Sequence, residues 1–196
     1  MGDVSRREVL EVLGGIPLLV AGLSPQAIHR ATLAAQQARA AGAAFAPRFF
    51  TPHELATASR LADLIIPRDE RSGSATDAGV PEFMDFILSE YEDMQITYRG
   101  GLAWMDREAY RRRGKTFVDL GDAEQRKILD DIAFPRKAGP GLSQGVNFFT
   151  RFRDLTASGF FSSKVGVADL RYIGNEFVTE WNGCAPEALA KLGVKY

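Results

Sequence analysis

The clearest helix signal of the chain is TPHELATASRLADLI, residues 51–65. Thr51 can cap a helix, Pro52 suits its first position, and Glu54 lies three residues after Thr51, which completes a capping box. Apolar residues then recur at helical spacing, at Leu55, Ala58, Leu61, Ala62 and Ile65. We expect an amphipathic helix that stops at Pro67, because the residue before a proline avoids the α region.

Apolar residues at helical spacing predict further helices on the C-terminal side of this one. They are expected near Val80, over residues 99–113, from Asp122, and around Phe148. Asp122 should cap its helix, with Gln125 three residues further on. Ser158-Gly159 should end the helix that contains Phe148. The three arginines at 111–113 are expected to complement the carbonyl end of their helix without any ligand.

The tail from Phe160 is rich in Gly, Asn and aromatic residues and predicts an irregular wrap before a short helix at Pro186–Leu192. No segment alternates as a strand would. The sequence therefore predicts an all-α fold, a compact single domain of about five helices with long loops and an irregular C-terminal tail.

The N-terminal segment carries the adjacent pair Arg6 and Arg7 ahead of an apolar run at 12–23. This order is typical of a twin-arginine (Tat) export signal, which directs folded proteins across the bacterial inner membrane. As a helix the run spans about 18 Å, against roughly 30 Å for a hydrocarbon core, so we expect a signal region rather than a membrane anchor. An amphipathic first helix with an incidental arginine pair is the alternative.

Two segments fit the Ala-x-Ala pattern of signal peptidase, Ala38-Arg39-Ala40 and Ala44-Phe45-Ala46, and the choice between them stays open. Residues 1–46 are therefore interpreted as signal peptide and spacer, and residues 47–196 as the helical domain. Because residues 24–46 are rich in Ala and Gln, we expect them to lie outside the core.

The amino-acid composition limits the classes of function that the chain can have. The chain has 24 Lys and Arg against 25 Asp and Glu, so it lacks the basic excess that nucleic-acid binding requires. With 45% hydrophobic residues and 13 Phe, it has enough apolar material for one core.

Motifs for cofactors and catalysis are missing. The glycines at 139, 141 and 145 are wrongly spaced for a dinucleotide fingerprint and follow a polar loop instead of a strand. No CxxCH motif for covalent haem occurs, and neither His29 nor His53 has a second histidine at metal-ligand spacing. The single cysteine, Cys184, can stay free, be buried, or bond to another chain.

Several segments together resemble the gluconate 2-dehydrogenase subunit 3 family. They are FTPHEL at 50–55, LADLIIPRD at 61–69, AGVPEFMD at 78–85, FF at 148–149 with LTASGFFSS at 155–163, and WNGCAP at 181–186. These segments cover about residues 49–193. The departure is Ala185, which stands between Cys184 and Pro186 where the family order is Gly-Cys-Pro.

The resemblance implies a small, non-catalytic, exported subunit without a cofactor of its own. Its partner would be a flavoprotein dehydrogenase of the glucose–methanol–choline type, which holds FAD and oxidises a sugar, sugar acid or polyol. A c-type cytochrome can serve as a third subunit in such complexes. The Tat translocase would act transiently, and the complex would reside in the periplasm, associated with the membrane only through partner subunits.

Three hypotheses follow. The first is the accessory subunit, which stabilises the flavoprotein and carries it through Tat export. The second is a free-standing periplasmic binding domain. The third is an independent enzyme with a site near residues 67–79, formed by Arg68, Asp69 and His53.

The aromatic-rich end of the chain is the candidate partner contact. Its residues are Phe160, Phe161, Phe177, Trp181 and Cys184. The alternative, that these aromatic side chains complete the core of the chain itself, stays open.

Overall fold

The computed structural model describes residues 23–40, 45–171, 179–180, 183–184 and 186–194. Within these residues it contains helices and no strand, which confirms the all-α class. The described part has eight α-helices, whereas the sequence predicts about five. They are α2 (Pro25–Ala40), α3 (Pro52–Ile65), α4 (Val80–Glu90), α5 (Glu92–Arg113), α6 (Asp122–Ala133), α7 (Ser143–Ser162), α8 (Lys164–Asp169) and α9 (Pro186–Leu192), with a 3-10 turn, η1 (Phe117–Asp119), before α6.

Helix α3 begins as the sequence predicts. The Thr51 hydroxyl accepts a hydrogen bond from the Glu54 amide at 3.2 Å, and the Thr51 amide donates to the Glu54 carboxylate at 2.8 Å. This capping box satisfies two amide groups that an open helix end would leave without partners. The helix then buries Leu61 and Ala62 completely in the core.

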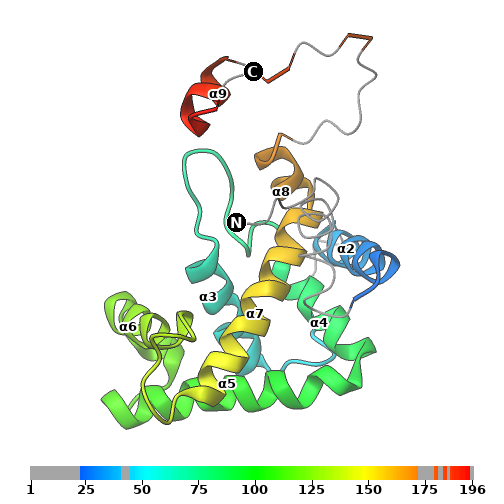
Figure 1. Cartoon of the computed structure of the whole chain (residues 1–196). Coiled ribbons are helices and arrows are strands. Elements are labelled where there is room, and N and C mark those ends of the chain that lie inside the picture. The colour runs from blue at the N-terminus through cyan, green and yellow to red at the C-terminus, as the bar shows by residue number, and fades with distance from the viewer. Residues whose placement is uncertain (1–22, 41–44, 172–178, 181–182, 185, 195–196) are drawn as a thin grey trace.

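Helix α7 passes through the middle of the molecule, from the end where it meets α5 and α6 to the end where α8 follows it (Figure 1). It contributes the largest group of aromatic side chains to the core, Phe148, Phe149, Phe152 and Phe160. Helices α2, α3 and α4 also pack against it.

The prediction that Ser158-Gly159 ends this helix is wrong, because α7 continues to Ser162. The Ser158 hydroxyl donates to the Asp154 carbonyl at 2.9 Å, so its polar side chain is accommodated inside the helix. Gly159 is required by packing, since a Cβ there would lie 2.8 Å from the Phe83 ring of α4. The helix stops at Ser163, whose hydroxyl caps α8 by accepting from the Gly166 amide.

Two other helix starts differ from expectation. Helix α5 begins at Glu92 instead of Arg99, because Met94, Ile96 and Tyr98 in its first turns are spaced by two residues and give no helical apolar stripe. The Asp122 side chain does not cap α6, whose N-cap is Gly121. The Asp122 carboxylate instead accepts hydrogen bonds from Arg60 of α3 at 2.6 Å and from Arg126 at 2.7 Å.

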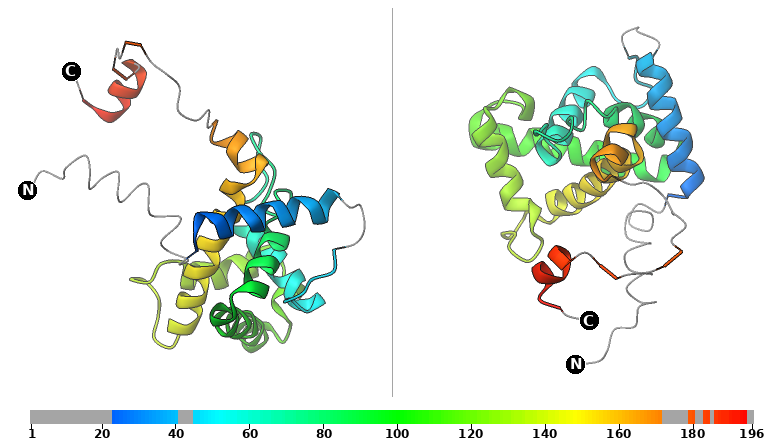
Figure 2. Two further views of the ribbon diagram at one scale, coloured as in Figure 1. Left: turned by 90° about the vertical axis from the view of Figure 1, so that its right-hand side faces the viewer. Right: turned by 90° about the horizontal axis from the view of Figure 1, so that it is seen from above.

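The expectation that residues 24–46 lie outside the core is wrong for helix α2. This helix packs against α4 and α7, and Figure 2 shows it lying along one side of the bundle. Ser24 caps it by accepting a hydrogen bond from the Ala27 amide at 3.2 Å. Its buried side chains are small, so the sequence of α2 lacks the large apolar residues that would indicate burial.

None of the helices that the structure describes is long and apolar enough to cross a lipid bilayer.

Candidate functional site

The loop of residues 67–79 is held by carboxylates that accept hydrogen bonds from its own backbone. Asp63, near the end of α3, accepts from the Thr76 amide and the Thr76 hydroxyl, each at 2.8 Å. Asp77 accepts from the Ser74 amide at 2.7 Å, and this bond, with others from the Ser74 hydroxyl and Arg68, holds the pKa of Asp77 below its usual value. The loop therefore has a defined shape.

Asp69 organises the first turn of the same loop. Its carboxylate accepts from the Ser72 and Arg71 amides at 2.8 Å each, and these bonds lower the Asp69 pKa. Arg68 pairs with Asp77, with nitrogen and oxygen 2.7 Å apart. Arg68 and Asp69, two of the three residues of the hypothetical enzyme site, thus have structural partners inside the loop.

The third residue of that group, His53, lies at the other end of α3. It lies twelve positions before the end of the helix at Ile65, which is about 18 Å along the axis. The His53 Nε2 atom instead lies 2.6 Å from the Asp106 carboxylate of α5. Asp106 also accepts from the Phe117 amide at 2.9 Å. The structure does not bring His53 together with Arg68 and Asp69; the histidine contributes to a tie between α3, α5 and η1.

The glycines at 139, 141 and 145 lie in and after a loop that leads into α7. Residues 135–137 form a turn, so no strand leads into them, and helix α7 begins at Ser143. Gly145 serves packing, because a Cβ at this position would lie 2.4 Å from the Trp104 ring of α5. Residues 135–145 therefore lack the strand–turn–helix order of a dinucleotide fingerprint.

Within the described residues, no group of three or more His, Cys, Asp or Glu side chains is placed to hold a metal ion.

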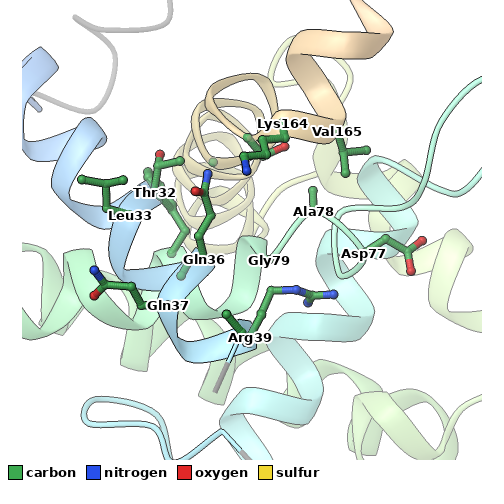
Figure 3. A pocket seen from close by; sticks show the side chains of 15 residues that line it. Thr32, Leu33, Gln36, Gln37, Arg39, Asp77, Ala78, Gly79, Lys164 and Val165 are labelled. Atoms are coloured by element: carbon green, nitrogen blue, oxygen red, sulfur yellow. The ribbon is translucent and has the colours of Figure 1, made fainter. Parts of the chain in front are cut away.

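A cleft of about 450 Å³ lies between α2, the end of the 67–79 loop and the start of α8 (Figure 3). Helix α2 contributes Thr32, Gln36 and Arg39 to it, and the opposite wall includes Gly79 and Lys164. The Arg39 guanidinium donates to the Thr76 carbonyl at 2.8 Å and lies 3.5 Å from Glu82 of α4. The cleft lies along the contact between α2 and the rest of the bundle. The hydrogen bond from Arg39 to the Thr76 carbonyl joins the helix to the loop there.

The candidate partner contacts differ in accessibility. Phe160 is 1% exposed and packs edge-on against Phe161, so it belongs to the core and offers no surface to a partner. Phe161 itself is 42% exposed. Cys184 is exposed as well. Phe177 and Trp181 lie outside the described residues.

Two polar clusters were not anticipated. Asp85, buried on α4, accepts hydrogen bonds from the amides of Arg48, Phe49 and Phe50 at 2.8 to 3.0 Å, which fixes the chain entering α3. The available signal was an aspartate within the otherwise apolar face of VPEFMDFIL, since a carboxylate is buried only where donors compensate it.

The second cluster joins α5 to α6. Glu108 accepts hydrogen bonds from Arg111 and Arg112, and Arg112 also pairs with Asp131 of α6 at 2.8 Å. The bond from Arg111, followed by that from Arg112, lowers the pKa of Glu108 from 4.5 to about 2. The arginine run was expected only to complement the helix dipole, and the structure adds this ion-pair network.

Comparison with known proteins gives one finding. A family model described as Gluconate 2-dehydrogenase subunit 3 matches residues 52–181, from the start of α3 to beyond α8. No curated protein and no solved structure matches the chain with significance.

Proposed function

Because the chain belongs to the gluconate 2-dehydrogenase subunit 3 family, we propose that it acts as the small, non-catalytic subunit of a dehydrogenase complex. The observation that carries this proposal is the family match over residues 52–181, which includes the loop and the helices around it. The partner is a flavoprotein of the glucose–methanol–choline type. In such a complex, FAD in that partner accepts electrons from a sugar, sugar acid or polyol, and a c-type cytochrome can receive them.

The contacts of the polar residues support a structural role. Asp63, Asp69 and Asp77 shape the 67–79 loop, and His53 contributes to the tie between α3 and α5. Each of these side chains has a partner within the fold. We propose that this fixed scaffold presents a surface to the flavoprotein and stabilises it.

The same proposal includes export. Arg6 and Arg7 supply the Tat address, and the flavoprotein travels as a bound, folded passenger to the periplasm. Any association with the membrane then depends on partner subunits. The compact helical bundle suits a route that carries folded proteins.

Replacement of both Arg6 and Arg7 by Lys tests the export address. Both this chain and the flavoprotein should stay in the cytoplasm, while the melting temperature of the purified chain stays unchanged, because the pair contributes only recognition. Cell fractionation with antibodies to both subunits is the measurement, and Arg30→Lys, at an exposed arginine of α2, is the matched control. Normal periplasmic levels of the double variant would refute the Tat assignment.

Phe161 is the accessible aromatic residue with which to test the partner contact. Phe161→Ala should weaken co-purification with the flavoprotein and leave the melting temperature within about 2 °C, since the side chain is 42% exposed. A lowered melting temperature with intact binding would assign Phe161 to the core instead.

A further inference from the structure

Helix α2 is built into the bundle by a stripe of small side chains. Ala27, Ala31 and Ala35 recur at every fourth position, so they share one face of the helix, and each is no more than 5% exposed. Leu23, just before the helix, is buried as well. Helix α2 contacts α4 and α7. Small side chains let helix backbones approach closely, and the stripe thus completes the wall of the core on this side.

Polar contacts tie both halves of α2 to other elements. The Thr32 hydroxyl lies 3.0 Å from the Ser162 hydroxyl of α7. In the last turn, Arg39 donates to the Thr76 carbonyl of the loop at 2.8 Å. Because Asp63 holds Thr76 through two further hydrogen bonds, the end of α2 is anchored to a fixed point of the domain.

The two Ala-x-Ala segments lie in or after this helix. Ala38-Arg39-Ala40 forms its last turn, and Ala44-Phe45-Ala46 follows it. Cleavage after Ala40 or Ala46 would therefore separate the whole of α2 from the domain and uncover the core surface that it buries. A peptidase also needs an extended substrate segment, whereas the first site is helical and its arginine is hydrogen-bonded to the loop.

We infer that α2 is a lasting part of the mature subunit and that processing of the leader leaves Ser24 and all residues after it in place. The inference rests on the proposed export, because only an exported chain meets signal peptidase. It goes beyond the family assignment, since the match begins at residue 52, after α2 has ended. Ser24 marks the boundary, because its hydroxyl caps the helix by accepting a hydrogen bond from the Ala27 amide.

The mature N-terminus tests the inference directly. The full-length chain, produced together with its flavoprotein and purified from the periplasm, is analysed by intact mass and N-terminal sequencing. We expect a chain that begins at or before Ser24. A chain that begins at Ala41, at Pro47 or anywhere else beyond Ser24 would overturn the inference while leaving export intact.

A pair of substitutions in the full-length chain gives an independent readout. Ala31 is fully buried and Leu33, two residues away on α2, is 43% exposed. If α2 remains packed, Ala31→Glu should lower the melting temperature of the purified subunit by about 5 °C or more, and Leu33→Glu by about 1 °C or less. Equal melting temperatures would overturn the inference, because a helix that is removed or unpacked cannot tell the two changes apart.

The two readouts also separate this inference from the proposed function. If the chain never reaches the periplasm, export fails, and the substitution pair, measured on chain purified from the cytoplasm, still decides whether α2 is part of the folded subunit.

Discussion

Helices α2 and α7 both pack into the core, but they do so with opposite kinds of side chain. Helix α7 inserts Phe148, Phe152 and Phe160, whereas the face of α2 is a stripe that includes Ala27, Ala31 and Ala35. Large side chains fill the space between elements, and small ones allow two backbones to approach. Side-chain size therefore indicates how closely a helix packs against its neighbours. It is a poorer indicator of whether the helix is buried at all.

The energetics of the two helices should differ accordingly. Each buried phenylalanine of α7 removes a large apolar area from water, while Ala27 and Ala31 of α2, which are at most 1% exposed, remove little and leave no room for additional atoms. Shortening a side chain should therefore harm α7 most, and lengthening one should harm α2 most.

The largest expected effect is a truncation in α7. Phe152→Ala should lower the free energy of unfolding by about 3–5 kcal/mol, because Phe152 is fully buried and its removal leaves a cavity. Denaturant unfolding followed by circular dichroism measures this. Phe161→Ala, at an exposed position of the same helix, is the control and should change stability by less than about 0.5 kcal/mol. A loss below about 1 kcal/mol for Phe152→Ala would contradict the placement of α7 in the core.

An enlargement in α2 should come next. Ala31→Leu should lower the free energy of unfolding by about 2 kcal/mol. Ala31 has no exposed surface, so a larger side chain would have to be packed inside the core. The same unfolding assay applies, with Leu33→Ala as the control. If Ala31→Leu proved neutral or stabilising, the close approach of α2 to the bundle would be wrong.

The sequence predicts α7 better than α2 for the same physical reason. Phenylalanines at helical spacing stand out, while alanines are common in exposed helices and in spacers alike, so Ala31 carries no signal of burial. The start of α3 is predictable through its capping box, because Thr51 and Glu54 act within one turn. The start of α6 depends on a residue distant in sequence, because the Asp122 carboxylate accepts a hydrogen bond from Arg60 of α3 and does not cap the helix.

For the candidate site as well, local features could be predicted from the sequence and long-range contacts could not. The lack of a nucleotide motif and the family resemblance were evident from local patterns. The pairing of His53 with Asp106, and the burial of Phe160, depend on how α3, α5 and α7 are placed, which no local pattern encodes. Grouping His53 with Arg68 and Asp69 failed because a helix of this length keeps its two ends apart.

Acid should weaken a contact that belongs to neither α2 nor α7. The Glu108 pKa is lowered from 4.5 to about 2, so its bonds to Arg111 and Arg112 stabilise the fold fully above about pH 5 and lose this contribution as the pH falls toward 2. We expect a contribution of about 1–2 kcal/mol, since Arg111 is largely exposed to solvent. The free energy of unfolding between pH 2 and pH 6 should show this loss in the wild type, and less of it in Glu108→Gln. An identical pH dependence in both would exclude Glu108 as a source.

The smallest effect concerns the contact between the two helices themselves. The hydroxyls of Thr32 and Ser162 lie 3.0 Å apart, and a double-mutant cycle with Thr32→Val and Ser162→Ala should give a coupling energy of about 0.5–1 kcal/mol. Zero coupling would mean that α2 and α7 are held together by packing alone.

The central claim concerns the partner. The tagged chain, produced in its native host and purified from the periplasm, should bring down a flavoprotein with about one FAD per complex and dehydrogenase activity toward a sugar, sugar acid or polyol. The chain purified alone should show neither flavin absorbance nor turnover. A yellow, active preparation of this single polypeptide, or a periplasmic chain that associates with no flavoprotein, would contradict its assignment as an accessory subunit.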